Sequence, residues 1–401
     1  MTTLPQPEQT TTIKQLRRQW GLVGAVWLLV WLLTYWQLQP IWPHSTRWLL
    51  LSALALAYSL WVSWRGLPQN RPAADAPLRR TLGIGNHLSL VRGLLISLMA
   101  GFLFSPWPMR GLGWFIVLLY TIADIADHFD GYLARITNHT TELGATLDME
   151  FDGLGMVIVT LLAVSFGQLP AWYLLLGFAR YFFVFGLWLR EKWGWPIHEM
   201  HDSVHRRVFA GFQMGFMSAI LWPIMPPPMA YLAGVLFALP TSFGFLRDWF
   251  VVIGWFKPTH PAYRRVQHFL YQAWGQWLPL LWRLVLPITM LLIYANQSSI
   301  LAPPNWIELF MSWHLPFTTA LAFIISLLAI ICTCLLFLGI LPRLAAFLLV
   351  FPIGFEIATM GLTPITGAAL TAVLLILILG PGKFALRPAE EYFIMNRLGG
   401  H

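Results

Sequence analysis

The chain alternates long apolar stretches with short polar ones over most of its 401 residues. A bilayer core of ~30 Å requires about 20 apolar residues per helix. By that measure the apolar stretches predict about 12 transmembrane helices. They lie near residues 20–38, 47–64, 89–107, 112–130, 152–169, 171–189, 207–224, 229–246, 278–295, 316–338, 343–360 and 365–380. The predicted fold is therefore all-α, a polytopic integral membrane protein.

Composition supports a membrane protein over a large soluble domain. Hydrophobic residues make up 58% of the chain and charged residues 10%, with 22 Trp and 28 Phe. A soluble domain of this length could not bury so much apolar surface. Residues 1–19 are polar and no small-residue cleavage site follows the first apolar stretch, so we expect the first helix to be retained.

The formal net charge of +8 indicates a lipid surface as a partner, not nucleic acid. Lys and Arg gather in alternate loops, and loops rich in these residues face the cytoplasm. The distribution predicts that both termini, and the polar stretch at 127–152, lie on the cytoplasmic side of a prokaryotic inner or plasma membrane. The residues that carry this bias are Lys14, Arg17, Arg18, Arg65, Arg71, Arg79, Arg80, Arg135, Arg190, Lys192, Arg206, Arg207, Lys257, Arg264, Arg265, Arg343, Lys383, Arg387 and Arg397.

Polar interruptions divide the chain into five parts. Residues 1–64 predict a two-helix hairpin, followed by a polar cytoplasmic linker at 65–80. Residues 81–255 predict a six-helix block, and residues 256–276 a basic, aromatic connector. Residues 277–401 predict a four-helix block.

Four aspartates stand where a membrane helix should be ending. Asp127 and Asp130 are three residues apart, and Asp148 and Asp152 are four apart. On helices both spacings place the carboxylates on one face. Such carboxylates would repel one another unless divalent cations lay among them. Oxygen ligands suit Mg²⁺ or Mn²⁺, and two bridged metal ions form a clamp for phosphoryl transfer.

Small residues and one arginine accompany these carboxylates. Gly131, Ala134 and Gly144 leave room for a base or a phosphate, and Arg135 offers a cation to phosphate oxygens. A solvated helix cap or a surface charge cluster is the alternative for either pair alone. A cation-binding membrane transporter is the alternative function. A cation pathway needs neither the arginine nor a cleared pocket, so the whole pattern favours a nucleotide site.

The full pattern resembles a known signature. Its eight positions are Asp127, Asp130, Gly131, Ala134, Arg135, Gly144, Asp148 and Asp152, and they match the signature of the CDP-alcohol phosphotransferases without departure. Upstream, the segment from Asn86 to Arg92 resembles the Asn-x-Leu-Thr-x-x-Arg opening of that family's first helix, with Ser89 in place of Thr. The six-helix block at 81–255 also resembles the family's core.

The resemblance implies roles for these residues. Asp127, Asp130 and Asp148 would ligate two Mg²⁺ or Mn²⁺ ions, and Asp152 would help hold one ion and act as the general base. The residues expected at the CDP moiety are Asp127, Gly131, Ala134, Arg135 and Gly144.

The implied reaction transfers a phosphatidyl group from a CDP-linked lipid, such as CDP-diacylglycerol, to an alcohol acceptor with release of CMP. Transfer from a soluble CDP-alcohol to a lipid alcohol stays open, as does the identity of the acceptor. The resemblance also implies a homodimer.

Other charged residues have two interpretations each. Arg180, inside a predicted span, could contact a phosphate or snorkel to the interface. Arg206 and Arg207 could bind an acceptor phosphate, but they also fit ordinary cytoplasmic positive charge. Glu356 is a lone carboxylate deep in a predicted span, a functional candidate without a predicted partner.

The last block carries three short motifs: Arg283 near its start, Leu338 to Phe347 in its middle, and the turn from Gly380 to Lys383 at its end. Together they resemble the DoxX-like four-helix membrane family. The resemblance implies little about activity beyond docking, regulation or lipid handling.

Overall fold

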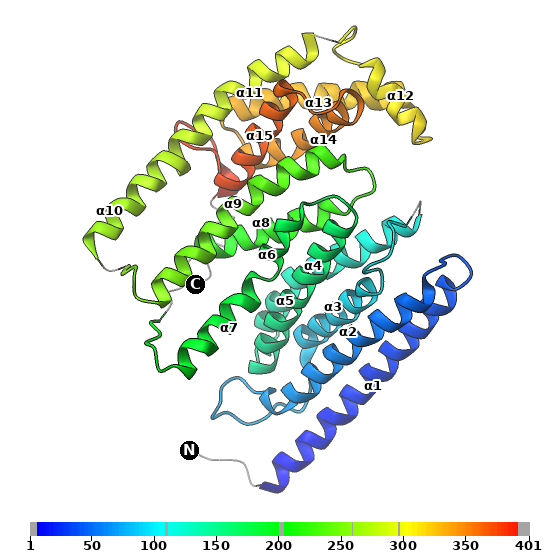
Figure 1. The fold of residues 1–401 in the computed structure, drawn as a ribbon, viewed down its shortest axis with the longest axis vertical. Coiled ribbons are helices and arrows are strands. Elements are labelled where there is room, and N and C mark those ends of the chain that lie inside the picture. Colours follow the sequence, from blue (N-terminus) through cyan, green and yellow to red (C-terminus); the bar gives the residue numbers. More distant parts are fainter. Residues whose placement is uncertain (1–5, 109–110, 200–203, 259, 296, 392–401) are drawn as a thin grey trace. The chain divides into compact units, whose positions relative to one another are not determined.

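The computed structural model describes residues 6–108, 111–199, 204–258, 260–295 and 297–391. These residues form helices and no named strand, as the apolar pattern predicted. Helices suit an apolar solvent because they satisfy backbone polar groups internally. The helices are α1 (Gln6–Leu38), α2 (Ser45–Gly66), η1 (Leu67–Gln69), α3 (Gly83–Ala100), α4 (Gly111–Ile136), α5 (Glu142–Ser165), η2 (Ala171–Tyr173), α6 (Leu174–Gly177), α7 (Ala179–Lys192), α8 (Val204–Ile220), α9 (Pro227–Val252), α10 (Pro261–Leu270), the π-helical η3 (Tyr271–Trp277), α11 (Leu278–Ala295), α12 (Pro304–Ser312), α13 (Thr318–Leu338), α14 (Pro342–Met360) and α15 (Pro364–Leu379) (Figure 1).

The predicted count of about 12 spans is not confirmed. Within the described ranges, eight helices are long and apolar enough to cross a membrane, or nine if the pair α6 and α7 counts as one span bent by 55°. Apolar helices α8 and α15 are shorter, and α5 carries four carboxylates among its first eleven residues. Each predicted span still overlaps a helix, so hydropathy located the helices better than it measured their lengths.

The chain forms two compact units. Residues 1–181 and 217–223 form the first, and residues 182–216 and 224–401 form the second. Two of the three boundaries fall inside α7 and α8, and the third lies between α8 and α9. Hydropathy and polar linkers predicted a division into five parts. That division stays a prediction.

In the first unit α3 is the central helix and packs against α2, α4 and α5. Trp48 of α2 is fully buried, and its indole N–H donates to the Leu98 carbonyl at 3.0 Å. Gly101 makes room for this ring, because a Cβ there would lie 2.3 Å from it. The predicted N-terminal hairpin is therefore packed into the unit that holds the aspartates.

The predicted linker at 65–80 is ordered by one buried amide. Asn70 donates through Nδ2 to the carbonyls of Arg79 and Thr81, at 3.1 and 2.8 Å. Its Oδ1 accepts from Asn86 of α3 at 3.2 Å. The Arg71 carbonyl accepts from the backbone N–H of Glu142 at 2.9 Å. The linker thus closes over the start of α5.

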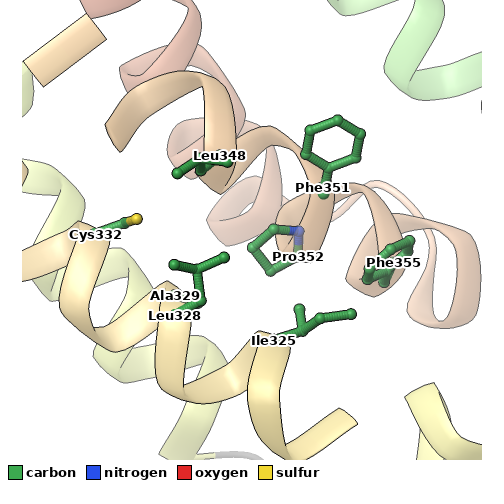
Figure 2. Close-up of a pocket in the computed structure, with 8 residues that line it drawn as sticks. All are labelled: Ile325, Leu328, Ala329, Cys332, Leu348, Phe351, Pro352 and Phe355. Carbon is green, nitrogen blue, oxygen red and sulfur yellow. The ribbon is translucent and has the colours of Figure 1, made fainter. Parts of the chain in front are cut away.

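In the second unit α15 packs against α9, α11 and α14 (Figure 1). The predicted connector at 256–276 is mostly helical, since α10 and η3 continue into α11 as one helix from Pro261 to Ala295. An apolar cavity of about 230 Å³ lies between α13 and α14 (Figure 2). Its lining residues are Ile325, Leu328, Ala329, Cys332, Leu348, Phe351, Pro352 and Phe355.

Candidate active site

Three helices of the first unit place charged side chains at one point. Asp127 and Asp130 lie on α4, Asp148 and Asp152 on α5, and Arg92 on α3. The spacing within each aspartate pair puts both carboxylates on the helix face that meets α3. The four predicted aspartates therefore converge.

Arg92 lies at the centre of the cluster, and its side chain is only 2% exposed. Its Nη1 lies 2.6 Å from Asp127 Oδ1 and 3.1 Å from Asp130 Oδ2. The same nitrogen lies 3.0 Å from Asp148 Oδ1, and Nη2 pairs with Asp152. One guanidinium thus faces four carboxylates and leaves the cluster with excess negative charge.

The two aspartates of α4 are more buried than the two aspartates of α5. The side chain of Asp130 is 9% exposed and that of Asp127 18%. Those of Asp152 and Asp148 are 35% and 45% exposed. Asp130 also accepts from the Ser89 hydroxyl at 2.7 Å, which holds its carboxylate in place. A ligand can approach from the α5 side.

The donor set fits a divalent metal ion. One carboxylate oxygen from each of Asp127, Asp148 and Asp152 lies within 4.8 Å of the others. Carboxylate oxygens are the ligands that Mg²⁺ and Mn²⁺ prefer. The excess negative charge would be offset by bound cations, since a single arginine cannot balance four carboxylates.

The start of α5 is held by side chains of α3 and the preceding loop. Thr141 caps the helix, accepting from the Gly144 N–H at 3.1 Å, and Asn86 Nδ2 donates to the Thr141 hydroxyl at 3.1 Å. A Cβ on Gly144 would lie 2.6 Å from Asn86 Oδ1. The motif residues Asn86 and Gly144 therefore meet each other, and this contact sets where α5 begins relative to α3.

The small residues of α4 lie beside the cluster. Ala134 packs near Gly85 of α3, where a Cβ on the glycine would lie 2.9 Å from the Ala134 Cβ. A Cβ on Gly131 would lie 3.2 Å from Arg135 Nη1, so the Arg135 side chain passes over Gly131. Arg135 is exposed, which leaves its guanidinium open to a ligand.

Arg180 is brought to the same unit by the bend between α6 and α7. A Cβ on Gly153, next to Asp152, would lie 3.2 Å from Arg180 Cδ and 3.2 Å from the Tyr181 hydroxyl. Arg206 and Arg207 lie on α8 in the second unit, and their side chains fall outside the described residues. Of the three arginines predicted to contact a phosphate, Arg180 therefore lies beside α5, next to Asp152.

Sequence reasoning missed two contributors. Arg92 ends the motif that begins at Asn86, and an arginine within so apolar a helix indicates carboxylate partners. Tyr58 of α2 donates to Glu150 Oε2 at 2.6 Å, and Glu150 lies between Asp148 and Asp152 on α5. No local pattern in the hairpin points to that contact.

Comparison with known proteins agrees with this geometry. Residues 82–256 match the family model described as CDP-alcohol phosphatidyltransferase. The chain therefore contains a CDP-alcohol phosphatidyltransferase domain. The helices that carry all four aspartates and Arg92 lie within the matched range. The resemblance of residues 277–401 to the DoxX-like family stays a prediction.

Several curated bacterial proteins are similar to this domain. A Mycobacterium tuberculosis protein named "Putative cardiolipin synthase" is 30% identical over 146 residues, covering 35% of this chain and 66% of that protein. The Cereibacter sphaeroides CDP-diacylglycerol–glycerol-3-phosphate 3-phosphatidyltransferase is 32% identical over 95 residues, covering 23% and 41%. The Rickettsia bellii protein of the same name is 38% identical over 107 residues, covering 25% and 55%. The chain thus spans less than two thirds of these relatives, and no solved structure matches it.

Proposed function

We propose that this protein is a membrane transferase that moves a phosphatidyl group from a CDP-linked lipid, such as CDP-diacylglycerol, to an alcohol acceptor and releases CMP. The single observation that carries the proposal is the convergence of four carboxylates from α4 and α5 on one point beside α3. The names of the similar bacterial proteins support the same chemistry.

Asp127, Asp130, Asp148 and Asp152 would hold two Mg²⁺ or Mn²⁺ ions. When bound, such ions neutralise charge on the pyrophosphate and stabilise the CMP leaving group. Arg92 fixes the direction of the four carboxylates before any ligand arrives, because its guanidinium contacts each of them. This pre-organisation lowers the cost of assembling the site.

Asp152 is the proposed general base. It lies on the more exposed, α5 side of the cluster, where an acceptor hydroxyl can approach. Its carboxylate would accept the hydroxyl proton as the acceptor oxygen bonds to phosphorus and the bond to CMP breaks. Gly131, Ala134 and Gly144 are proposed to border the CDP moiety, with Arg135 and Arg180 as cations for phosphate oxygens.

The Lys and Arg distribution supports a cytoplasmic site, where soluble CMP can leave and a polar acceptor can enter. The names of two relatives make glycerol 3-phosphate the first acceptor to test. A homodimer is part of the proposal, as the family resemblance implies.

The test is CMP release by the purified protein in lipid nanodiscs. CDP-diacylglycerol and Mg²⁺ or Mn²⁺ are supplied with glycerol 3-phosphate, inositol phosphate, serine or phosphatidylglycerol, and the lipid product is identified by mass spectrometry. CMP formed together with a new phospholipid supports the proposal. Absence of CMP with every acceptor, in protein that is folded and binds Mn²⁺, refutes it.

A further inference from the structure

A cavity of about 1600 Å³ lies within the second unit. It is bounded by the end of α9, the following loop, α10, η3 and the turn after α15. Sites for small soluble ligands usually enclose roughly 300–1,000 Å³, so this cavity suits a larger molecule. The proposed transfer reaction does not use it.

The polar part of the wall is basic. Lys257 and Arg264 line the cavity, and neither has an ion-pair partner among the residues whose placement is described. The acidic lining residues Asp248 and Glu391 each lie beside an arginine of their own, Arg247 and Arg343. The charge of Lys257 and Arg264 is therefore available to an anion.

The rest of the wall is aromatic and aliphatic. Trp255 and Trp274 line it and are 73% and 58% exposed. Tyr263 and Tyr271 also line it. Trp and Tyr concentrate where acyl chains meet headgroups. An anion that fits this wall carries a large apolar part beside its charge.

The C-terminal turn gives the cavity a firm edge. In η3 the Gln276 carbonyl accepts from the Lys383 N–H at 3.0 Å. Gly382 permits this approach, since a Cβ there would lie 2.6 Å from the Gln276 oxygen. Buried Arg283 donates to the Pro381 carbonyl at 2.9 Å and holds the turn from the other side. π-helical turns such as η3 are rare and often lie at functional sites.

We infer that this cavity binds one anionic phospholipid. Its phosphate would lie against Lys257 and Arg264, and its acyl chains against Trp255 and Trp274. A soluble phosphate would leave the aromatic wall in water. A zwitterionic lipid brings an ammonium group beside its phosphate and therefore no net negative charge to offset the two cations. This site goes beyond the proposed transferase reaction and does not depend on it.

The experiment is native mass spectrometry of the full chain in detergent, titrated with phosphatidylglycerol or phosphatidylcholine. Lys257→Gln combined with Arg264→Gln is expected to weaken phosphatidylglycerol binding on the order of tenfold, because each basic residue near a lipid surface contributes to anionic lipid affinity. The matched control, Lys14→Gln with Arg18→Gln, replaces one exposed Lys and one exposed Arg of α1 and should keep wild-type binding.

The combination Lys257→Arg with Arg264→Lys keeps the charge and should retain binding, which separates charge from folding. Equal affinity for phosphatidylcholine, or unchanged binding in the Gln variant, would overturn the inference. Displacement of the lipid by excess glycerol 3-phosphate would assign the site to a soluble anion instead. Lipid binding that appears only after deletion of residues 392–401 would assign it to the chain's own C-terminus.

Discussion

The acidic cluster of the first unit and the basic cavity of the second are built in opposite ways. The cluster takes its side chains from the faces of α3, α4 and α5, where helical spacing of three or four residues already pairs them. The cavity takes Lys257 from a loop and Arg264 from α10, and a turn more than a hundred residues later closes it. Each aspartate pair is therefore set by local helical spacing, whereas no part of the cavity is encoded by spacing within one helix.

The comparison also separates two uses of charge in an apolar protein. The four carboxylates surround a single buried arginine, so the cluster is organised around an internal cation and retains excess negative charge. The cavity is lined by Lys257 and Arg264, which have no ion-pair partner among the described residues, and by the aromatic rings of Trp255 and Trp274. The first arrangement suits metal ions and the second suits an amphiphilic anion.

The largest expected effect is at the proposed base. Asp152→Asn should lower the rate of CMP release by about a hundredfold to ten-thousandfold, the range that proton transfer contributes in general-base catalysis. Asp75→Asn, on an exposed linker carboxylate, is the matched control and should retain the wild-type rate. A folded Asp152→Asn variant with full activity would remove Asp152 from the mechanism.

The next largest effect is expected from replacing Arg92, the arginine that contacts all four aspartates. Arg92→Gln should lower the free energy of unfolding by about 3–5 kcal/mol in EDTA, because buried charges lose their partner. Mn²⁺ should restore more stability to this variant than to the wild type, since the cation offsets the same carboxylates. Thermal denaturation in detergent measures both, with exposed Arg18→Gln as the control. Equal stabilisation by Mn²⁺ in variant and wild type would contradict the role of Arg92.

A smaller effect is expected where α5 begins. Gly144→Ala places a methyl group 2.6 Å from Asn86 Oδ1 and should cost about 1–3 kcal/mol of stability. Gly21→Ala is the matched control, because a Cβ there meets no atom within 4 Å. If both variants melt at the wild-type temperature, the contact between Asn86 and Gly144 does not position α5.

The smallest effect is expected at the contact from the hairpin. Tyr58→Phe removes one hydroxyl that donates to Glu150, and it should cost about 0.5–1.5 kcal/mol of stability. Tyr132→Phe, an exposed tyrosine of α4, should cost nothing measurable. Chemical denaturation measures the difference between the two variants. Equal denaturation midpoints would show that the contact between Tyr58 and Glu150 adds no stability.

The sequence allowed the membrane class, the helices and each aspartate pair to be predicted, because these depend on hydropathy and on helical spacing. The convergence of the two aspartate pairs was harder to predict, since it depends on how α4 and α5 pack on α3. Arg92, six residues beyond Asn86, could have been found from the rarity of buried arginines in apolar helices. The contact between Tyr58 and Glu150 could not have been predicted, because it joins residues 92 positions apart in the sequence.

Other features resisted prediction for similar reasons. Buried Asn70 orders a linker whose composition is typical of a loop, through hydrogen bonds that no local pattern encodes. The bend between α6 and α7 interrupts a stretch that is apolar enough for a straight span. Glu356 had no predicted partner. The structure pairs it with Gln297, Asn305 and Trp306, which donate to it at 2.8, 3.2 and 3.1 Å.

The most direct test of the acidic cluster is Mn²⁺ binding followed by electron paramagnetic resonance, which needs no substrate or turnover. Wild-type protein should bind Mn²⁺ as a spin-coupled pair, and Asp148→Asn should abolish the coupling and weaken binding by tenfold or more. Asp75→Asn should behave as the wild type. Unchanged Mn²⁺ binding in Asp148→Asn would contradict a metal centre formed by these four aspartates.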